Sequence, residues 1–318
     1  MNIVVVGSLS FDFIMNFPGR FSDHILPDKI HILNLSFLTE KLNKNFGGTA
    51  GNIAYNLAQL KNNVAILATA GKDFNVYQKF LNKTGVNTKY IKKYQNDFTS
   101  NYFVVVDKLD NQIGGFYAGA MIQATKLSLK NIKEKIDFVI ISPTVPEAMI
   151  NLAKECQQLK VPYLFDPGMQ LPRLTKEQLL QGISGAKILI GNDYEVSLMQ
   201  KKLNLTSQTL KNKVDILITT LAEKGSFIEA KNPPTGGKKI IVTSAKPAKI
   251  LDPVGAGDAY RSGFMAGFSR NFNLKTCGQM GATTAVYTVE KYGTTTHRFT
   301  IKEFCARYKK NFGEDLVL

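Results

Sequence analysis

Glycines and an aspartate stand together at the start of one helical pattern, in the stretch Asp-Pro-Val-Gly-Ala-Gly-Asp at residues 252–258. Gly255 and Gly257 flank Ala256 and leave backbone N–H groups open to an anion, with the positive end of a helix dipole behind them. A carboxylate at Asp258 would repel a phosphate that was only to be bound. The same carboxylate is well suited to act as a base that removes the proton from a hydroxyl as that hydroxyl attacks a phosphoryl group. The alternative is that Asp258 only caps its helix.

A second glycine cluster opens another predicted helix. Gly47, Gly48 and Gly51 lie within five residues, so backbone can approach a ligand closely there, and Asn52 offers both a donor and an acceptor. A tight turn into a helix would explain the first two glycines equally well. No Gly-Lys-Ser/Thr follows, and the first strand does not lead into Gly-x-Gly-x-x-Gly, so the two commonest nucleotide-binding loops are excluded.

Two further acidic positions follow predicted strands. Asp12 comes where parallel α/β folds place ligand-binding groups, and its carboxylate can accept hydrogen bonds from two vicinal sugar hydroxyls; a turn aspartate is the alternative. Asn192 and Glu195 start a helix, either as a capping box or as a polar and acidic pair near phosphates and Mg²⁺. The three histidines form no triad or metal-binding spacing.

The elements that must position these residues alternate between short apolar runs and amphipathic stretches. Continuous β-branched or apolar runs are typical of strands buried on both faces. They occupy 3–6, 64–68, 138–141, 163–166, 188–190 and 216–219, and helical patterns occupy 49–60, 74–82, 146–159, 176–182 and 194–203. This alternation predicts an α/β fold, with a mostly parallel sheet between two helical layers.

Two segments break the alternation, at about 11–40 and 100–118. The second reads as two strands around a turn at 109–112, and both could project as a small β-layer. Such a layer could be a lid that excludes water from phosphoryl transfer, or its apolar face could be a dimer contact. A further hairpin is predicted at 225–242, across 233–237, and helices are predicted from Asp258 to the end. We expect one domain over 1–318.

Composition narrows the class of protein. Of 318 residues, 44% are hydrophobic and 20% charged, a globular mixture with no apolar run long enough for a membrane span. The first residues resemble a strand rather than a signal peptide, and three widely spaced cysteines fit a reduced, cytoplasmic protein. The net charge of +15 is scattered in short groups, which favours solvated lysines over a nucleic-acid or membrane surface and would attract anionic nucleotides.

Together these features resemble the PfkB family of carbohydrate and nucleoside kinases, over nearly the whole chain. Its two signatures occur in order, at 46–52 and 252–258, and its Asn-x-x-Glu element runs from Asn192 to Glu195. Within the family the chain is most similar to bacterial adenosine kinases, at 17–21, 35–38, 116–121, 192–195 and 219–221. The resemblance implies a three-layer α/β/α sandwich with a β-lid, the cofactors ATP and Mg²⁺, activation by a monovalent cation such as K⁺, and a homodimer through the lids.

The resemblance also implies roles for individual residues. Asp258 would be the base for the acceptor's 5′-hydroxyl, and the N–H groups of Gly255, Ala256 and Gly257 would form the anion hole. The other implied roles are substrate binding by Asp12, Gly48, Asn52, Ser8, Ser36, Gln170 and Phe116, ATP binding by Asn192, Thr220 and Gly225, a water-mediated contact of Glu195 with Mg²⁺, and a monovalent cation site at Asp252. Phe116 would stack on the base.

The chain departs from the family pattern at two positions. Ala222 stands where many relatives have glycine in the ATP loop, and Ala118 replaces a proline that often follows Phe-Tyr in the lid. We therefore expect an ATP-dependent kinase of a nucleoside, with adenosine as the favoured acceptor. The alternatives are a ribokinase-type or fructokinase-type sugar kinase and, outside this class, a non-catalytic nucleotide-binding or nucleic-acid-binding protein.

Overall fold

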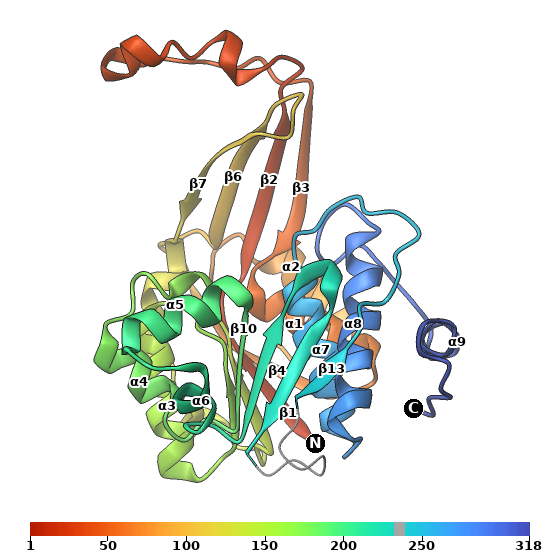
Figure 1. The fold of residues 1–318 in the computed structure, drawn as a ribbon. Helices are drawn as coiled ribbons and strands as arrows, with labels where there is room; N and C mark the ends of the chain where they lie inside the picture. The colour runs from red at the N-terminus through yellow and green to blue at the C-terminus, as the bar shows by residue number, and fades with distance from the viewer. Residues whose placement is uncertain (232–238) are drawn as a thin grey trace.

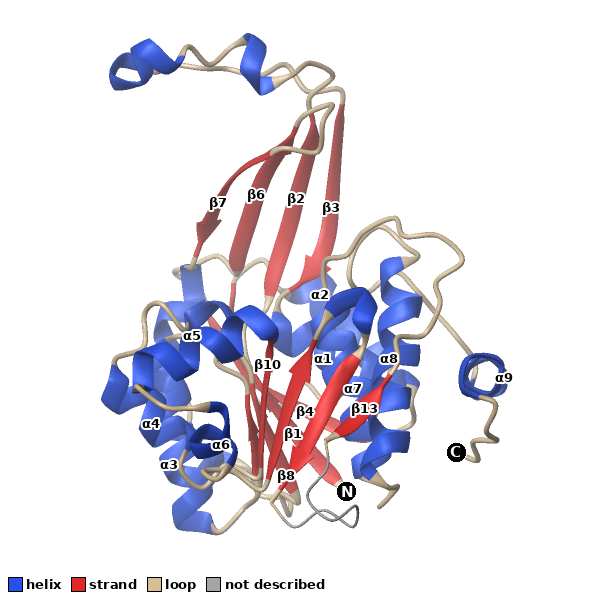
Figure 2. Cartoon of the chain, in the orientation of Figure 1, coloured by secondary structure: helices blue, strands red, loops and turns tan. Residues whose placement is uncertain are grey.

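The computed structural model describes residues 1–231 and 239–318. These residues form a large sheet covered by helices on both faces, and a small second sheet rises from one end of it (Figures 1 and 2). The large sheet has the order β13-β12-β11-β10-β9-β8-β1-β4-β5 and is parallel except where β12 pairs with β11 and β13. Its strands are β1 (Asn2–Val6), β4 (Asn63–Gly71), β5 (Ile91–Tyr94), β8 (Phe138–Ile141), β9 (Tyr163–Phe165), β10 (Ile188–Asn192), β11 (Ile216–Thr220), β12 (Ser226–Ala230) and β13 (Ile240–Val242). The predicted mostly parallel α/β sandwich is confirmed.

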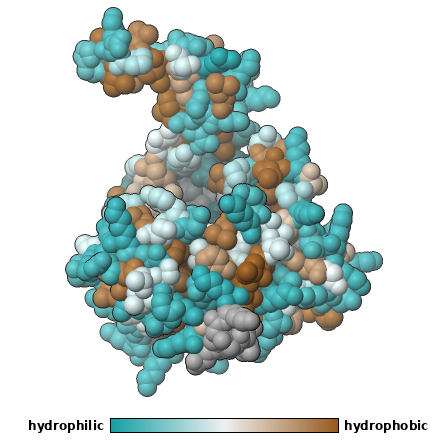
Figure 3. Space-filling view, viewed as in Figure 1, coloured by the Kyte–Doolittle hydropathy of each residue, from teal (hydrophilic) through white to brown (hydrophobic). Residues whose placement is uncertain are grey.

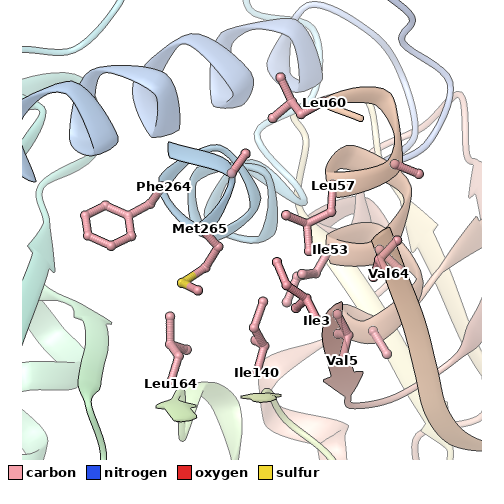
Figure 4. Close-up of a cluster of buried hydrophobic side chains, with 14 of the residues drawn as sticks. Ile3, Val5, Ile53, Leu57, Leu60, Val64, Ile140, Leu164, Phe264 and Met265 are labelled. Carbon is pink, nitrogen blue, oxygen red and sulfur yellow. The ribbon is translucent and has the colours of Figure 1, made fainter. Parts of the chain in front are cut away.

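Strand alternation explains the two helical layers. In β1, Ile3 and Val5 face one core while Val4 and Val6 face the other, because successive side chains of a strand point to opposite faces. Figure 4 shows Ile3 and Val5 directed towards the side chains of α1 and α7. The first core is covered by α1 (Thr49–Gln59), α2 (Asn75–Lys83), α7 (Ala256–Phe268), α8 (Leu274–Val289) and α9 (Ile301–Phe312), and the second by α3 (Pro146–Leu159), α4 (Lys176–Ile183), α5 (Asp193–Leu203) and α6 (Ser207–Lys211).

The small sheet, called the lid sheet below, has the strand order β3-β2-β6-β7. Its strands are β2 (Ser10–Asn16), β3 (Lys41–Gly47), β6 (Ser100–Val106) and β7 (Gln112–Tyr117). Since β2 begins four residues after β1 ends, the lid sheet stands beside the carboxyl ends of the main strands (Figure 1). The predicted hairpin of β6 and β7 is confirmed.

The first lid segment differs in its bounds from the prediction of 11–40. Strand β3 extends to Gly47, because its polar residues pair with β2 over the whole length of that strand. Residues 17–40 lie outside the sheet. They form an arm at the far tip of the lid, with 3-10 helices at Phe21–Asp23 and Pro27–Ile32 (Figure 1).

Other differences lie at the sheet edge and in the C-terminal region. Strand β5 was not predicted; β12 and β13 confirm the predicted hairpin strands, and their turn at 233–237 lies outside the described residues. The region beyond α7 is helical as predicted, but residues 293–300 form a non-helical connection before α9. Among the helices of 1–231 and 239–318, none has the length and apolar character that a membrane crossing requires.

Candidate active site

The site is built around the start of α7. Gly255 adopts φ +80°, and a Cβ there would lie 2.7 Å from the Thr294 methyl carbon, so the turn requires glycine. Helix α7 begins at Ala256, and the N–H groups of a helix's first turn lack intrahelical acceptors. Asp258 lies in that same turn, so a carboxylate and an anion-binding end of a helix share one place.

A chain of hydrogen bonds fixes the Asp258 carboxylate. The Asn52 Nδ2 donates to Asp258 Oδ2 at 2.9 Å, and the Thr294 hydroxyl donates to Asn52 Oδ1 at 2.7 Å. Asn52 and Thr294 are both buried. The two glycine-bearing signatures, which are some 200 residues apart in sequence, therefore meet through the side chains of Asn52 and Asp258.

Asp12 joins this group from the lid sheet. Its Oδ1 accepts a hydrogen bond from the Ser10 hydroxyl at 2.9 Å, and its carboxylate lies so close to Gly47 that a Cβ there would be 2.1 Å from Oδ2. Gly48 adopts φ +85° against the backbone of Ser8. The turn interpretation accounts for Gly48, which meets backbone at positive φ, whereas Gly47 ends β3 and leaves room for the Asp12 carboxylate. This close approach places Asp12 beside the start of α1.

Strand register places Phe116 on the same face of the lid sheet as Asp12. Asp12 pairs with Tyr102 on β6, and Tyr102 pairs with Phe116 on β7. Directly paired residues project from the same side of a sheet. The Phe116 ring is 52% exposed, so its surface is available to a planar ligand.

Gln170 lies in a 3-10 turn that follows β9, at the carboxyl end of the main sheet. Its side chain is 8% exposed, and within the described part of the chain its Oε1 has no hydrogen-bond partner. A buried unpaired acceptor is costly, so this oxygen suits a ligand's N–H or O–H group.

The residues assigned to ATP lie along the carboxyl ends of β10 and β11. Asn192 and Thr220 are direct partners in the parallel register. Asn192 also caps α5: its Oδ1 accepts from the Glu195 N–H and Glu195 Oε2 accepts from the Asn192 N–H, both at 2.8 Å. Gly225 turns at φ +89° against the Val242 carbonyl. The capping box of the sequence analysis is thus present, and Glu195 Oε1 is outside it.

Two loops are joined at Asp252. Its Oδ1 accepts from the Val254 N–H at 2.9 Å and its Oδ2 from the Gly293 N–H at 3.0 Å. This aspartate therefore connects the turn before α7 to the segment that carries Thr294. Among the described residues, no cluster of three or more His, Cys, Asp or Glu could by itself hold a metal ion.

Two predicted substrate residues are placed differently from the others. The Ser8 hydroxyl accepts a hydrogen bond from the Thr49 N–H at 3.1 Å, so it serves the start of α1. Ser36 is exposed in the arm, at the far tip of the lid from α7 (Figure 1). The structure does not bring Ser36 to Asp258 within this chain.

Three functional candidates were missed by the sequence analysis: Asp166, Arg261 and Thr294. Asp166 follows β9 and is 1% exposed, and Arg261 pairs with it, Nε to Oδ2 at 2.6 Å and Nη2 to Oδ1 at 2.9 Å. Arg261 is a charged residue within the otherwise uncharged stretch Ala259–Phe268, a signal that could have identified it. For Thr294 we find no such signal, because its partner Asn52 is distant in sequence.

Burial opposes the charge of three carboxyl groups of the site, those of Asp12, Asp166 and Asp258. It raises the pKa of Asp12 to about 6, against the hydrogen bond from Ser10, while the charges of Asp252 and Asp258 add to the rise. Burial also raises the pKa of Asp166 to about 7, and the facing Arg261 guanidinium opposes this rise. The pKa of Asp258 is raised by burial as well, against the opposing effects of Arg261 and Asn52. A perturbed group of this kind beside an anion site is typical of acid–base catalysis.

Comparisons with known proteins identify the family of this chain. The model of the pfkB family carbohydrate kinases matches residues 2–300. A nucleoside kinase of Methanocaldococcus jannaschii is 31% identical over 97% of both chains. The structure of Burkholderia thailandensis nucleoside kinase in complex with inosine superimposes with a TM-score of 0.88 at 30% identity, covering 98% of this chain and 99% of that one. A structure of the same enzyme with ADP and inosine gives a TM-score of 0.85. The chain therefore belongs to the PfkB family of carbohydrate kinases and is a phosphotransferase that acts on a hydroxyl group.

Proposed function

We propose that this protein transfers the γ-phosphate of ATP to the 5′-hydroxyl of a nucleoside, with adenosine as the favoured acceptor. The observation that carries the proposal is the hydrogen-bonded group of Asn52 and Asp258 at the start of α7, with Asp12 close by. Sugar-binding and proton-accepting groups are thus adjacent to an anion-binding helix end. The nucleoside kinases of M. jannaschii and B. thailandensis support a nucleoside as the acceptor.

In the proposed reaction, Asp258 accepts the proton of the 5′-hydroxyl as its oxygen bonds to the γ-phosphorus. The bond between that phosphorus and the β,γ-bridging oxygen breaks, and ADP leaves. The N–H groups at Gly255, Ala256 and Gly257 hold the oxygens of the transferring group, whose charge is spread in the transition state. Asn52 keeps the Asp258 carboxylate in place for the proton transfer.

On the acceptor side, Asp12, Gly48 and Asn52 hold the ribose hydroxyls. Phe116 lies on the same face of the lid sheet as Asp12 and stacks on the base. Stacking of a base on an aromatic ring contributes about 1–3 kcal/mol in nucleic-acid complexes. Gln170 completes the acceptor site, and its Oε1 is the buried acceptor that a nucleoside donor would satisfy. Ser8 contributes by holding the start of α1, next to Gly48, through the bond that its hydroxyl accepts from the Thr49 N–H.

On the donor side, Asn192, Thr220 and Gly225 line the ATP site. Glu195 keeps Oε1 outside the capping box, which suits a water-mediated contact with Mg²⁺, a cation that usually retains several waters and binds through few carboxylates. When bound, Mg²⁺ neutralises charge on the phosphates of ATP. For K⁺ we propose Asp252, because each carboxylate oxygen has a further lone pair beyond the bond it accepts.

We further propose a homodimer through the lid sheets. On the face opposite Asp12, the paired residues Leu42, Met15, Val105 and Ile113 form an apolar row across all four strands. The arm adds five exposed aliphatic side chains, Leu26, Ile30, Ile32, Leu33 and Leu38. Figure 3 shows hydrophobic surface, in brown, on the arm at the top of the view. A second copy would cover this surface and could carry its Ser36 to the partner's site.

ADP formation from ATP with Mg²⁺ and K⁺ tests the proposal across adenosine, inosine, guanosine, cytidine, ribose and fructose. We expect turnover with nucleosides, highest with adenosine. Turnover with inosine alone would keep the nucleoside kinase and change the base preference. Turnover with only a free sugar would overturn both the nucleoside acceptor and the role of Phe116. Salt-dependent retention on DNA without ATP turnover would instead support the alternative of a non-catalytic nucleic-acid-binding protein.

A further inference from the structure

Arg261 is a buried cation at the positive end of a helix. Side chains in an α-helix lean towards its N-terminus, and that of Arg261 runs back along α7 to the turn that holds Asp258. The residue is 9% exposed. Burial and the helix dipole both disfavour a positive charge there, so the guanidinium needs anionic partners.

Asp166 holds this guanidinium in a two-point contact. Nε lies 2.6 Å from Asp166 Oδ2 and Nη2 donates to Oδ1 at 2.9 Å, which orients the planar group. The remaining nitrogen, Nη1, lies beside Gly257: a Cβ on that residue would be 2.5 Å from it. Gly257 therefore leaves room for Arg261, and the guanidinium lies beside the first turn of α7.

A pair of apolar side chains could fill the same space without the cost of burying charge. The positive charge of Arg261 is stabilised by the anionic groups around it. The charges of Asp166, Asp258 and Glu195 all raise the pKa of the guanidinium. Because lysine lacks the planar fork, it could not hold Asp166 at two points while keeping a third nitrogen at Gly257.

We propose that Arg261 is a positioning residue of the phosphoryl-transfer centre: clamped by Asp166, it holds the Gly257 turn and supplies the positive charge that keeps Asp258 ionised as the base. This inference rests on the proposed kinase function. It concerns a residue that acts through the anion hole and through Asp258.

The sign of the effect on Asp258 follows from the groups that face it. Burial raises the pKa of Asp258 and Glu195 adds to the rise, while Arg261 and the Asn52 hydrogen bond lower it. Asp12 and Asp166 contribute negative charge from the lid sheet and the end of β9. Removal of the Arg261 charge thus raises the pKa of Asp258, and removal of the Asp166 charge lowers it.

The test is the pH profile of kcat/KM for the nucleoside, whose acid limb reports the base in the free enzyme. We expect the limb of Arg261→Met to move up by about one pH unit or more. Arg261→Lys should keep the limb within about half a unit of wild type, because its charge is retained, and lower kcat at the plateau about tenfold through loss of the Gly257 contact. The matched control is Arg270→Met, since Arg270 follows α7 and donates to the Leu60 and Ala266 carbonyls; its limb should stay in place.

The Asp166→Asn variant shows whether Asp258 or Asp166 is responsible for the acid limb. This control is needed because the pKa of Asp166 is itself raised to about 7. The acid limb should persist in this variant and move to lower pH. Its disappearance would assign the limb to Asp166 and overturn the inference, and so would an Arg261→Met limb that coincides with wild type. If Arg261→Met does not fold, the pH profiles of Asp166→Asn and Arg261→Lys test the inference in its place. A limb that does not move to lower pH in Asp166→Asn, or wild-type kcat in Arg261→Lys, would overturn it. Absence of wild-type turnover, or full activity of Asp258→Asn, would instead refute the kinase mechanism itself.

Discussion

At the residue scale, the site holds carboxyl groups under conditions that disfavour their charge. Asp12, Asp166 and Asp258 all have raised pKa values, and burial is the largest cause in each case. A carboxylate that must accept a proton in the reaction works best when its pKa lies near the working pH. The same raised pKa costs folding free energy whenever the group is ionised.

Asp12→Asn should therefore make the folded protein more stable at neutral pH while weakening nucleoside binding. The pKa of Asp12 rises from 3.8 to about 6 on folding, so its contribution to stability is present below pH 3.8 and is lost as pH rises through 6. We expect the free energy of unfolding of Asp12→Asn at pH 8 to exceed that of wild type by up to about 3 kcal/mol, the ceiling for a shift of this size. Urea unfolding at pH 4 and pH 8 measures it.

A control for Asp12 has the opposite sign. The Asp107 carboxylate accepts hydrogen bonds from the N–H groups of Phe21, Leu109 and Asn111. Although desolvation disfavours its charge, these bonds lower its pKa to about 2. Asp107→Asn should thus be less stable than wild type at pH 8. An Asp12→Asn protein that is less stable than wild type at pH 8 would contradict the argument from burial.

Thr294→Val tests the orientation of Asn52. Without the Thr294 hydroxyl, the Asn52 amide can turn its oxygen towards Asp258, and its buried Oδ1 loses a donor. We expect kcat/KM to fall about fivefold to tenfold, the equivalent of one hydrogen bond of roughly 1 kcal/mol. Thr296→Val, which removes an exposed hydroxyl bonded to the Tyr292 carbonyl, should have no such effect. Equal kinetics for the two variants would refute this role.

At the element scale, the two departures from the family pattern have different consequences. Ala118 adopts φ −71°, the value that a proline imposes, so the backbone takes the same conformation without it. Ala222 adopts φ +50°, in the left-handed region that favours glycine. The replacement of glycine therefore places strain in the loop between β11 and β12, next to the residues proposed for ATP.

Ala222→Gly should relieve that strain. A left-handed conformation costs an L-residue about 1–2 kcal/mol, which offsets the usual cost of glycine. We expect the free energy of unfolding to stay equal to that of wild type or rise by up to about 1 kcal/mol. Ala306→Gly, at an exposed site in α9, is the control and should lose about 1 kcal/mol. Equal losses in chemical denaturation would show that Ala222 is unstrained.

At the scale of the whole molecule, the exposed outer face of the lid sheet predicts association. Phe103 stacks on Phe13 at 4.9 Å and is still 44% exposed, beside the apolar row that contains Leu42 and Ile113. A Leu42→Glu and Ile113→Glu double variant should be monomeric where wild type is a dimer in analytical ultracentrifugation. Ile241→Glu, at an exposed isoleucine on β13, is the control and should leave the dimer intact. A monomeric wild type would contradict the proposed dimer.

The chain's alternation of apolar runs and amphipathic stretches was sufficient to predict the sandwich, since strands buried on both faces have a distinctive pattern. Local geometry was predictable too: the turn at Gly255 and the capping box of Asn192 are short-range features. The pairing of Asp166 with Arg261 was not, because 95 residues separate the partners. The boundary between the arm and β3 was not predictable for a related reason. The residues of β3 are mostly polar, and they form a strand only because they pair with β2.

The most direct test of the whole account is the rate at which Asp258→Asn forms a nucleoside 5′-phosphate from ATP and adenosine at saturation. The substitution keeps the size of the side chain and removes the proton acceptor at the start of α7. We predict a kcat about 10²–10⁴-fold below wild type, the scale of a general base, in a protein that is still folded by circular dichroism. Normal turnover by this variant would show that Asp258 is not the base and that the site works by another mechanism.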